Sequence, residues 1–339
     1  MGMKILKWYN TCPEFEDRNL YVKCKLISIW GEKMFKYILK RLVSSIITLW
    51  FVITITFFLM HAIPGGPFTG DRKLPAAVMD NLNEKFGLNK PLGIQYKNYL
   101  IDLVHGDLGL SMYTQGMTVN QFIKDLFPAS LKVGICAIIF AVVFGMLLGI
   151  IAALRQGKLL DNICMVISTF GVAVPSMILA PVMIYIFAVK FNILPAVGLD
   201  SPLNYIMPAV ALGLYYMAFI ARLIRSSIVE VIRTDYIKVA RAKGLSKYKI
   251  VFKHVLKNSL IPVVTYLGPI TAGVFTGSFV IESVFGIPGL GRQFVQSISN
   301  RDYTVIMGVT VFFCSLLIIC NLIVDLMYVV IDPRIKLDS

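Results

Sequence analysis

Three kinds of residue in this sequence could do chemistry, and their spacing argues against each of the usual reactions. His61, His105 and His254 lie far apart, so they predict no metal cluster. None of the six cysteines forms a CxxC pair, and four lie in apolar runs, which is typical of small core residues. Segment 286–291, GlyIleProGlyLeuGly, lacks the preceding strand and the Lys-Ser/Thr pair of a nucleotide-binding loop. We therefore predict no catalytic residue, no metal and no cofactor on this chain.

What remains is charge, and it is concentrated between two apolar runs. Ten of the 33 Lys and Arg residues lie in segment 222–261. Thr234 can cap a short helix over 235–243 that Gly244 ends, and Ser246 can cap a second helix. The second helix should carry an apolar stripe of Tyr248, Val251, Phe252, Val255, Leu256 and Ser259 opposite Lys249, Lys253 and Lys257. A basic membrane-surface loop explains this pattern, and so does a rigid protrusion that another protein grips.

The elements that position this segment are long apolar runs. Hydrophobic residues make up 57% of the chain and charged residues 15%, against about 25% charge in soluble domains. Runs long enough to cross a bilayer lie at about 39–62, 129–154, 162–189, 204–224, 262–284 and 304–330. Gly273 and Gly277, four residues apart in the fifth run, predict a face for close helix packing. The sequence therefore predicts an all-α membrane protein with six transmembrane helices.

The distribution of positive charge orients these helices. In a six-span arrangement, 23 of the 33 Lys and Arg residues fall on one side, so the positive-inside rule places both termini in the cytoplasm. The net charge of +14 is thus a sign of topology, and we predict contact with membrane lipid and none with nucleic acid. The expected division is an extension over 1–33 (cytoplasmic or a start-site artefact), a first transmembrane helix over 34–63, an extracytoplasmic helical lobe over 64–128, a membrane domain over 129–330 with its basic loop at 225–261, and a cytoplasmic tail over 331–339.

The expected lobe has its own helix signals. Pro75 can open a helix that Gly87 ends, and Pro91 can open a second helix. On the second, Leu92, Tyr96, Tyr99, Leu100 and Leu103 follow helical spacing. The lobe could contact an extracellular partner, cap a translocation path or serve as a structural lid.

Two other classes of function fit the residues less well. A proton-coupled secondary transporter would show more spans, internal repeats and ionisable groups at mid-membrane, whereas Glu282 and Asp325 lie near helix ends. An intramembrane serine protease would need a Ser with a His at membrane depth, but segment 276–280 is not GxSxG and only His61 lies at that level.

The basic segment resembles the coupling loop of ABC-importer permeases of the peptide/nickel branch. The resemblance rests on TyrIleLysValAlaArgAlaLysGlyLeu (236–245) and IleValPheLysHisValLeuLysAsnSerLeuIlePro (250–262). The general family pattern is Glu-Ala-Ala, then three residues, then Gly. In this chain Lys238, Val239 and Ala240 stand at the Glu, Ala and Ala positions, so only Ala240 and Gly244 fit the pattern. Further matching stretches are 57–67, 87–96, 106–111, 282–292, 300–303 and 331–335. Segments 153–157, 174–181 and 266–278 are most similar to oligopeptide permease B-type subunits.

The resemblance implies a type I importer permease in a bacterial or archaeal plasma membrane. It implies pairing with a second homologous permease, two ABC ATPase subunits that bind ATP and Mg, and an extracytoplasmic binding protein that delivers oligopeptides. Dipeptide or nickel transport remains an alternative. The residues expected to couple to the ATPase are Tyr236, Val239, Ala240, Arg241, Ala242, Lys243, Gly244 and Leu245. Among them, Arg241 and Lys243 would contact the ATPase, Ala240 and Ala242 would allow close packing, and Gly244 would set the angle between the two helices.

Overall fold

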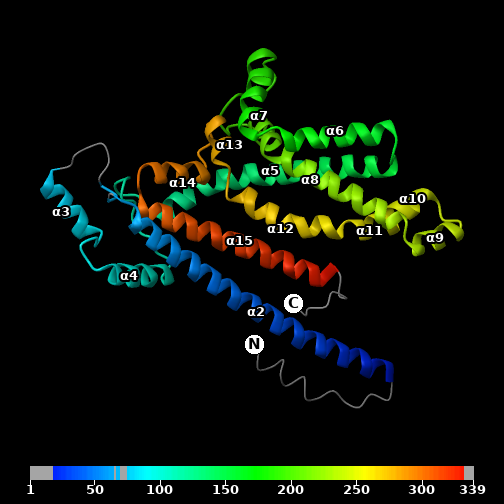
Figure 1. Ribbon diagram of the computed structural model, residues 1–339, viewed down its shortest axis with the longest axis horizontal. Coiled ribbons are helices and arrows are strands. Elements are labelled where there is room, and N and C mark those ends of the chain that lie inside the picture. The colour runs from blue at the N-terminus through cyan, green and yellow to red at the C-terminus, as the bar shows by residue number, and fades with distance from the viewer. Residues whose placement is uncertain (1–17, 65, 69–74, 332–339) are drawn as a thin grey trace.

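The computed structural model describes residues 18–64, 66–68 and 75–331, and this part of the chain is helical (Figure 1). The helices are α2 (Arg18–Ala62), α3 (Ala76–Lys85), α4 (Leu92–Val104), α5 (Val119–Leu154), α6 (Leu159–Ala173), α7 (Ser176–Met183), the π-helix η1 (Ile184–Lys190), the 3-10 helix η2 (Pro202–Tyr205), α8 (Ile206–Ile232), α9 (Asp235–Ala242), α10 (Lys247–Lys249), the π-helix η3 (Ile250–Val255), α11 (Leu256–Ser259), α12 (Ile261–Phe275), α13 (Phe279–Val284), α14 (Leu290–Ser299) and α15 (Tyr303–Ile331). One isolated bridge joins Leu110 and Thr118.

The number of membrane-crossing helices depends on two bent pairs. Four helices are long and apolar enough to cross a membrane: 38–62, 119–154, 202–232 and 303–324. Two pairs meet the same test together but are bent, by 104° between 159–173 and 176–190 and by 46° between 250–259 and 261–275. The described chain therefore has four spans, or six if each bent pair is one span. The all-α membrane class is confirmed. Two of the expected runs are not continuous helices, because 162–189 is broken at 174–175 and the helix of 262–284 ends at Phe275.

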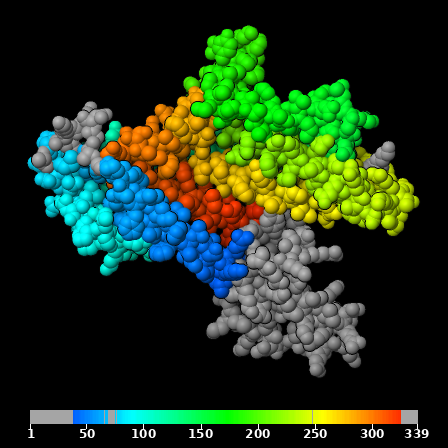
Figure 2. All heavy atoms as spheres, in the orientation of Figure 1, coloured from blue at the N-terminus to red at the C-terminus, as the bar shows by residue number. Residues whose placement is uncertain are grey.

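Local backbone chemistry explains the breaks. Val174 is extended (φ −92°, ψ 115°) because the following Pro175 disfavours helical geometry at the residue before it. As a result α7 and η1 project from the side of the bundle (Figures 1 and 2). The fifth run does not continue to residue 284 as expected. It ends at Phe275, and Gly277, with φ +80°, turns the chain into the separate helix α13. Apolar residues flank both breaks, so hydropathy alone does not reveal them.

Close packing of α5 against α8 forms the centre of the bundle. Ala137, Ala141, Ile220, Ile224 and Ile228 are buried in one core cluster on these two helices. A Cβ atom on Gly145 would lie 2.8 Å from the carbonyl oxygen of Met217, and one on Gly149 would lie 2.5 Å from that of Ala221. Gly213 of α8 makes the same kind of contact, since its Cβ would lie 2.7 Å from the carbonyl oxygen of Ala137. Glycines on both helices thus let the two backbones approach.

Two smaller structures lie at opposite ends of the long axis, the α3–α4 lobe at one end and α9 at the other (Figure 1). The lobe helices form where expected, and Pro75 and Pro91 each occupy the N-cap position of their helix. Gly87 ends α3 with φ +66°. Helix α2 begins at Arg18, so residues 18–33 continue the first membrane helix. Residues 1–17 and 332–339 and the side chain of Asp325 lie outside what the structure describes.

Candidate functional site

Helix α9 is fixed to the rest of the chain along one face. Ile237 and Ala240 are buried in the core cluster that also holds Ile250 and Val255 of η3. At the edge of this contact, Asn258 Nδ2 donates a hydrogen bond of 2.8 Å to the Tyr236 hydroxyl. A short helix is marginal by itself, so this packing makes α9 a rigid outcrop of the bundle.

Gly244 ends α9 as expected and determines how the chain leaves it. Its φ is +74°, and its N–H donates to the carbonyl of Arg241 at 3.0 Å while the Leu245 N–H reaches the carbonyl of Ala240 at 3.4 Å. These two bonds are those of a Schellman motif, with glycine at the left-handed position. The expected cap at the other end takes a different form. Thr234 occupies the N-cap position, but its hydroxyl donates to the carbonyl of Val231 at 2.6 Å.

The outward face of α9 carries most of the residues expected to dock a partner. Tyr236, Val239, Arg241, Ala242 and Lys243 are exposed, Val239 with 53% of its surface open. Ala240 differs from the expectation that it meets a partner, because it is only 8% exposed and packs into this chain's own core. It therefore positions the helix and leaves the contact surface to its neighbours. Leu245 is also partly buried against the same core.

In the helix after Gly244, the residues that share a face differ from the predicted apolar stripe. Ser246 accepts a hydrogen bond of 3.4 Å from the Lys249 N–H at its start, as expected of a cap. Residues 250–255 are then π-helical, which widens the turn and changes which side chains share a face. Ile250, Val255 and Ser259 are buried, whereas Tyr248 and Phe252 are exposed and pack ring against ring at 4.3 Å. The exposed aromatic pair thus adds to the surface beside α9.

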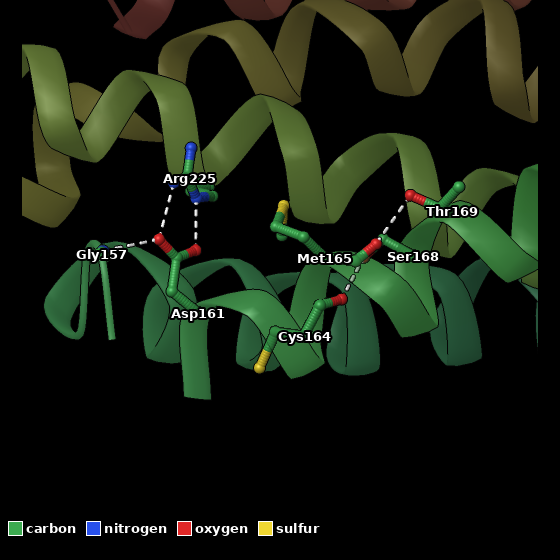
Figure 3. Close-up of polar contacts among 7 residues, drawn as sticks. All are labelled: Gly157, Asp161, Cys164, Met165, Ser168, Thr169 and Arg225. Atoms are coloured by element: carbon green, nitrogen blue, oxygen red, sulfur yellow. Dashed lines mark hydrogen bonds and ion pairs between the residues drawn. The ribbon is translucent and has the colours of Figure 1, made fainter. Parts of the chain in front are cut away.

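A buried ion pair holds the same end of the bundle together (Figure 3). Arg225 of α8 donates two hydrogen bonds of 2.7 Å to the Asp161 carboxylate at the start of α6, and the Gly157 N–H donates a third of 2.9 Å. The Asp161 side chain is 3% exposed. This fork-to-fork geometry is the strong form of an Arg–carboxylate pair. It ties the α5–α6 turn to the helix that leads into α9, and sequence reasoning missed it because the partners are 64 residues apart.

A second buried carboxylate, Glu282, lies towards the other end of the molecule. Ser130 Oγ donates to it at 2.8 Å and the Arg292 N–H at 2.6 Å, while the Leu290 N–H donates to Ser130. Burial raises the pKa of this carboxyl, and the bonds from Ser130 and Arg292 act in the opposite direction. A Cβ on Gly289 would collide with the carboxylate, so the glycine-rich segment 286–291 encloses Glu282 and locks α13 and α14 to α5.

Asp302 connects two segments that the sequence resemblance had marked separately. Its carboxylate accepts hydrogen bonds from the Ser111 hydroxyl and from the N–H groups of Met112 and Tyr113. It also accepts one from the Val305 N–H at the start of α15. Segments 106–111 and 300–303 therefore meet in space, and the lobe is anchored to the last membrane helix.

In the part of the chain that the structure describes, no three His, Cys, Asp or Glu residues group as metal ligands would. The described chain is a bundle of helices long and apolar enough to cross a membrane, with a packed and exposed helix at one end. Residues 145–337 match the family model of the binding-protein-dependent transport system inner membrane component, and residues 34–134 match the model of its N-terminal part. The chain belongs to this family.

Curated relatives match along nearly their whole length. The chain is 46% identical over 304 residues to the dipeptide transport system permease protein DppB of Bacillus subtilis (strain 168), covering 90% of this chain and 99% of the relative. It is 45% identical over 305 residues to the oligopeptide transport system permease protein OppB of Haemophilus influenzae, covering 89% of this chain and 100% of that relative.

A solved structure supports the fold independently. The inward-facing MetNI methionine ABC transporter matches with a TM-score of 0.53 at 21% identity, over 62% of this chain and 97% of that chain. The protein is therefore a multi-pass inner-membrane permease of an ABC transport system. Such a system implies a separate ATPase, a partner permease and a binding protein.

Proposed function

We propose that this chain is one of two permease subunits in an importer that takes up peptides from an extracytoplasmic binding protein. Relatives named for dipeptide and for oligopeptide transport match it at nearly the same identity, 46% and 45%. Both names share one substrate chemistry, the peptide main chain. The proposed cargo is therefore short peptides, from dipeptides upward.

The observation that carries the mechanism is the two-sided character of α9. Its inner face is buried in the chain's core through Ile237, while Val239 and Tyr236 on its outer face are open. We propose that the outer face docks an ATPase subunit that binds ATP and Mg. Because α9 is packed against η3 and follows directly after α8, movement of the docked subunit would be transmitted to the membrane helices. Arg241 and Lys243, both exposed, would contact the ATPase through charge.

The proposed topology follows from this docking. With α9 in the cytoplasm, the α3–α4 lobe at the opposite end of the long axis lies outside, where a binding protein arrives (Figure 1). Six crossings then place both termini in the cytoplasm. The excess of Lys and Arg on the α9 side supports this orientation.

The docking proposal is tested by matched charge substitutions at the two ends of the molecule. Val239→Glu places a charge on the outer face of α9, and Val104→Glu makes the same change at a position of α4 that is 84% exposed. We expect V239E to abolish co-purification of the ATPase and uptake of labelled peptide, because an unpaired charge would be buried in the contact. V104E should retain ATPase co-purification. Normal assembly and peptide uptake by V239E would contradict the proposal.

A further inference from the structure

The open face of α8 is polar from the middle of its membrane span to the end of the helix that leads into α9. Beyond its first residue, the exposed residues of α8 are Tyr215, Arg222, Ser226 and Glu230, spaced at seven, four and four residues, so they share one side. Tyr215 is 49% exposed and lies about 25 Å along the helix from its last residue, Ile232. This face therefore extends from deep in the span to the end that bears α9.

Helix α12 continues the same face. Its exposed residues are Thr265, Pro269 and Gly273, four residues apart, with no large apolar side chain among them. The two helices meet where Phe219 and Tyr266 stack with ring centres 4.1 Å apart. Near the outer end, a Cβ on Gly273 would lie 3.5 Å from the Tyr216 hydroxyl. We call the combined surface of Tyr215, Arg222, Thr265, Pro269 and Gly273 the polar face.

Neighbouring helices show what a lipid-facing surface of this chain contains. From residue 135 to 154, every exposed residue of α5 is apolar: Ile135, Ile139, Val143, Phe144, Leu147, Ile151 and Leu154. The exposed large apolar side chains of α6 are Leu159, Leu160, Ile163, Val166, Ile167 and Phe170. Arg222 stands near the end of the expected run 204–224, whereas Tyr215 lies nine residues inside that run. Polar groups at membrane depth normally face a bundle interior or a water-filled cavity. The polar face is therefore turned away from lipid in the assembled transporter.

A cavity at the outer end of this face must also be kept away from lipid. It measures about 370 Å³ and is bordered by the break at Val174 and Pro175, by Tyr215 and Tyr216, and by Gly277. The 104° bend interrupts the helix here, and irregular backbone at membrane depth persists only where protein covers it or it lines water. The cavity and the polar face thus form one continuous surface that excludes lipid.

We infer that the polar face and its cavity line a hydrated path and contact the main chain of the peptide in passage, a role that rests on the proposed function. The Tyr215 phenol can donate a hydrogen bond to a carbonyl oxygen, which every peptide carries whatever its side chains. The Thr265 hydroxyl donates to the Ile261 carbonyl at 3.0 Å, so it can accept a hydrogen bond from a peptide N–H. Arg222 offers a cation to a terminal carboxylate. Gly273 and Pro269 leave open the space that larger side chains would fill. A surface of this kind selects for main chain and tolerates variation in sequence.

The test uses the complete importer in proteoliposomes, with single cysteines in a chain whose own cysteines are replaced by alanine. Cysteines at 215, 222 and 265 probe the polar face, and cysteines at 139 and 163 probe the apolar faces of α5 and α6. The probe is a charged, membrane-impermeant methanethiosulfonate. The probe reacts with the thiolate, which needs water to form. We therefore expect cysteines on the polar face to be labelled about tenfold faster, or more, than the cysteines at 139 and 163. Trialanine, added with the binding protein, should slow that labelling, and retained ATPase activity shows that each variant assembles.

Each outcome bears on a separate part of the inference. Labelling at 215, 222 and 265 as slow as at 139 and 163 overturns the hydrated path, while peptide uptake by the unaltered importer still tests the proposed function. Fast labelling that trialanine does not slow overturns the peptide contact and leaves the path standing. Loss of assembly at one position is resolved by a cysteine at 269 on the same face.

Discussion

The open faces of α8 and α5 belong to two helices packed against each other, yet they have opposite chemistry. From residue 135 to 154 the α5 face is made of Ile, Val, Leu and Phe side chains, whereas the α8 face presents Tyr215, Arg222, Ser226 and Glu230. Both helices pass the same test of length and hydropathy for a membrane span. The difference teaches that mean hydropathy identifies a span but not the solvent on its open side. For this permease, the polar face marks the side on which another subunit and the substrate are expected.

The two arginines of α8 give the strongest contrast. Arg225 is held by the buried Asp161, whereas Arg222, one turn away, is exposed. Arg225→Gln should destabilise the fold by about 3 kcal/mol or more, because it leaves a buried carboxylate without its partner. The unfolding midpoint of the purified permease measures this effect.

Arg222→Gln is the matched control for that change. We expect it to leave the unfolding midpoint unchanged and to lower peptide uptake, since its side chain belongs to the proposed path. Equal destabilisation by R222Q and R225Q would show that the open arginine is also structural.

Two glycines, Gly149 in the α5–α8 contact and Gly273 on the polar face, allow the buried and open surfaces to be compared by adding a single methyl group. Gly149→Ala forces a Cβ to within 2.5 Å of the Ala221 carbonyl in the α5–α8 contact, so we expect destabilisation of about 1–3 kcal/mol from overpacking. Gly273→Ala adds the same atom on the polar face, where the nearest neighbour is the Tyr216 hydroxyl at 3.5 Å, and the fold should tolerate it. Thermal unfolding of both variants in the same detergent checks the pair, and greater destabilisation by G273A would contradict it.

Much of the architecture could be predicted from the sequence, because its signals are local. The apolar runs, the lobe helices after Pro75 and Pro91, and the helix ended by Gly244 all depend on residues a few positions apart. The bend at Pro175 and the turn at Gly277 were missed since both lie within runs that remain apolar on either side. Gly273 and Gly277 were expected to pack another helix, whereas Gly273 is open and Gly277 forms a turn.

The site was predicted in outline but not in orientation. Helix α9 has only eight residues, too few for periodicity to decide that Ala240 faces the core while Val239 faces out. The π-helical stretch over 250–255 then changed which side chains share a face. The buried pairs of Asp161 with Arg225 and of Glu282 with Ser130 join residues 64 and 152 positions apart. Contacts at such separations come from packing, which a single sequence does not display.

The most direct test of the two-faced bundle is one arginine placed on either face, as Ile139→Arg on α5 and as Tyr215→Arg on α8. An arginine facing lipid near the centre of a span costs about 2.5–3.5 kcal/mol on insertion, whereas one facing water costs far less. The measurement is the yield of assembled importer extracted from the membrane, relative to the unaltered chain. We expect I139R to lose most of the assembled complex and Y215R to retain it. Equal loss in both variants, or retention only in I139R, would contradict the account.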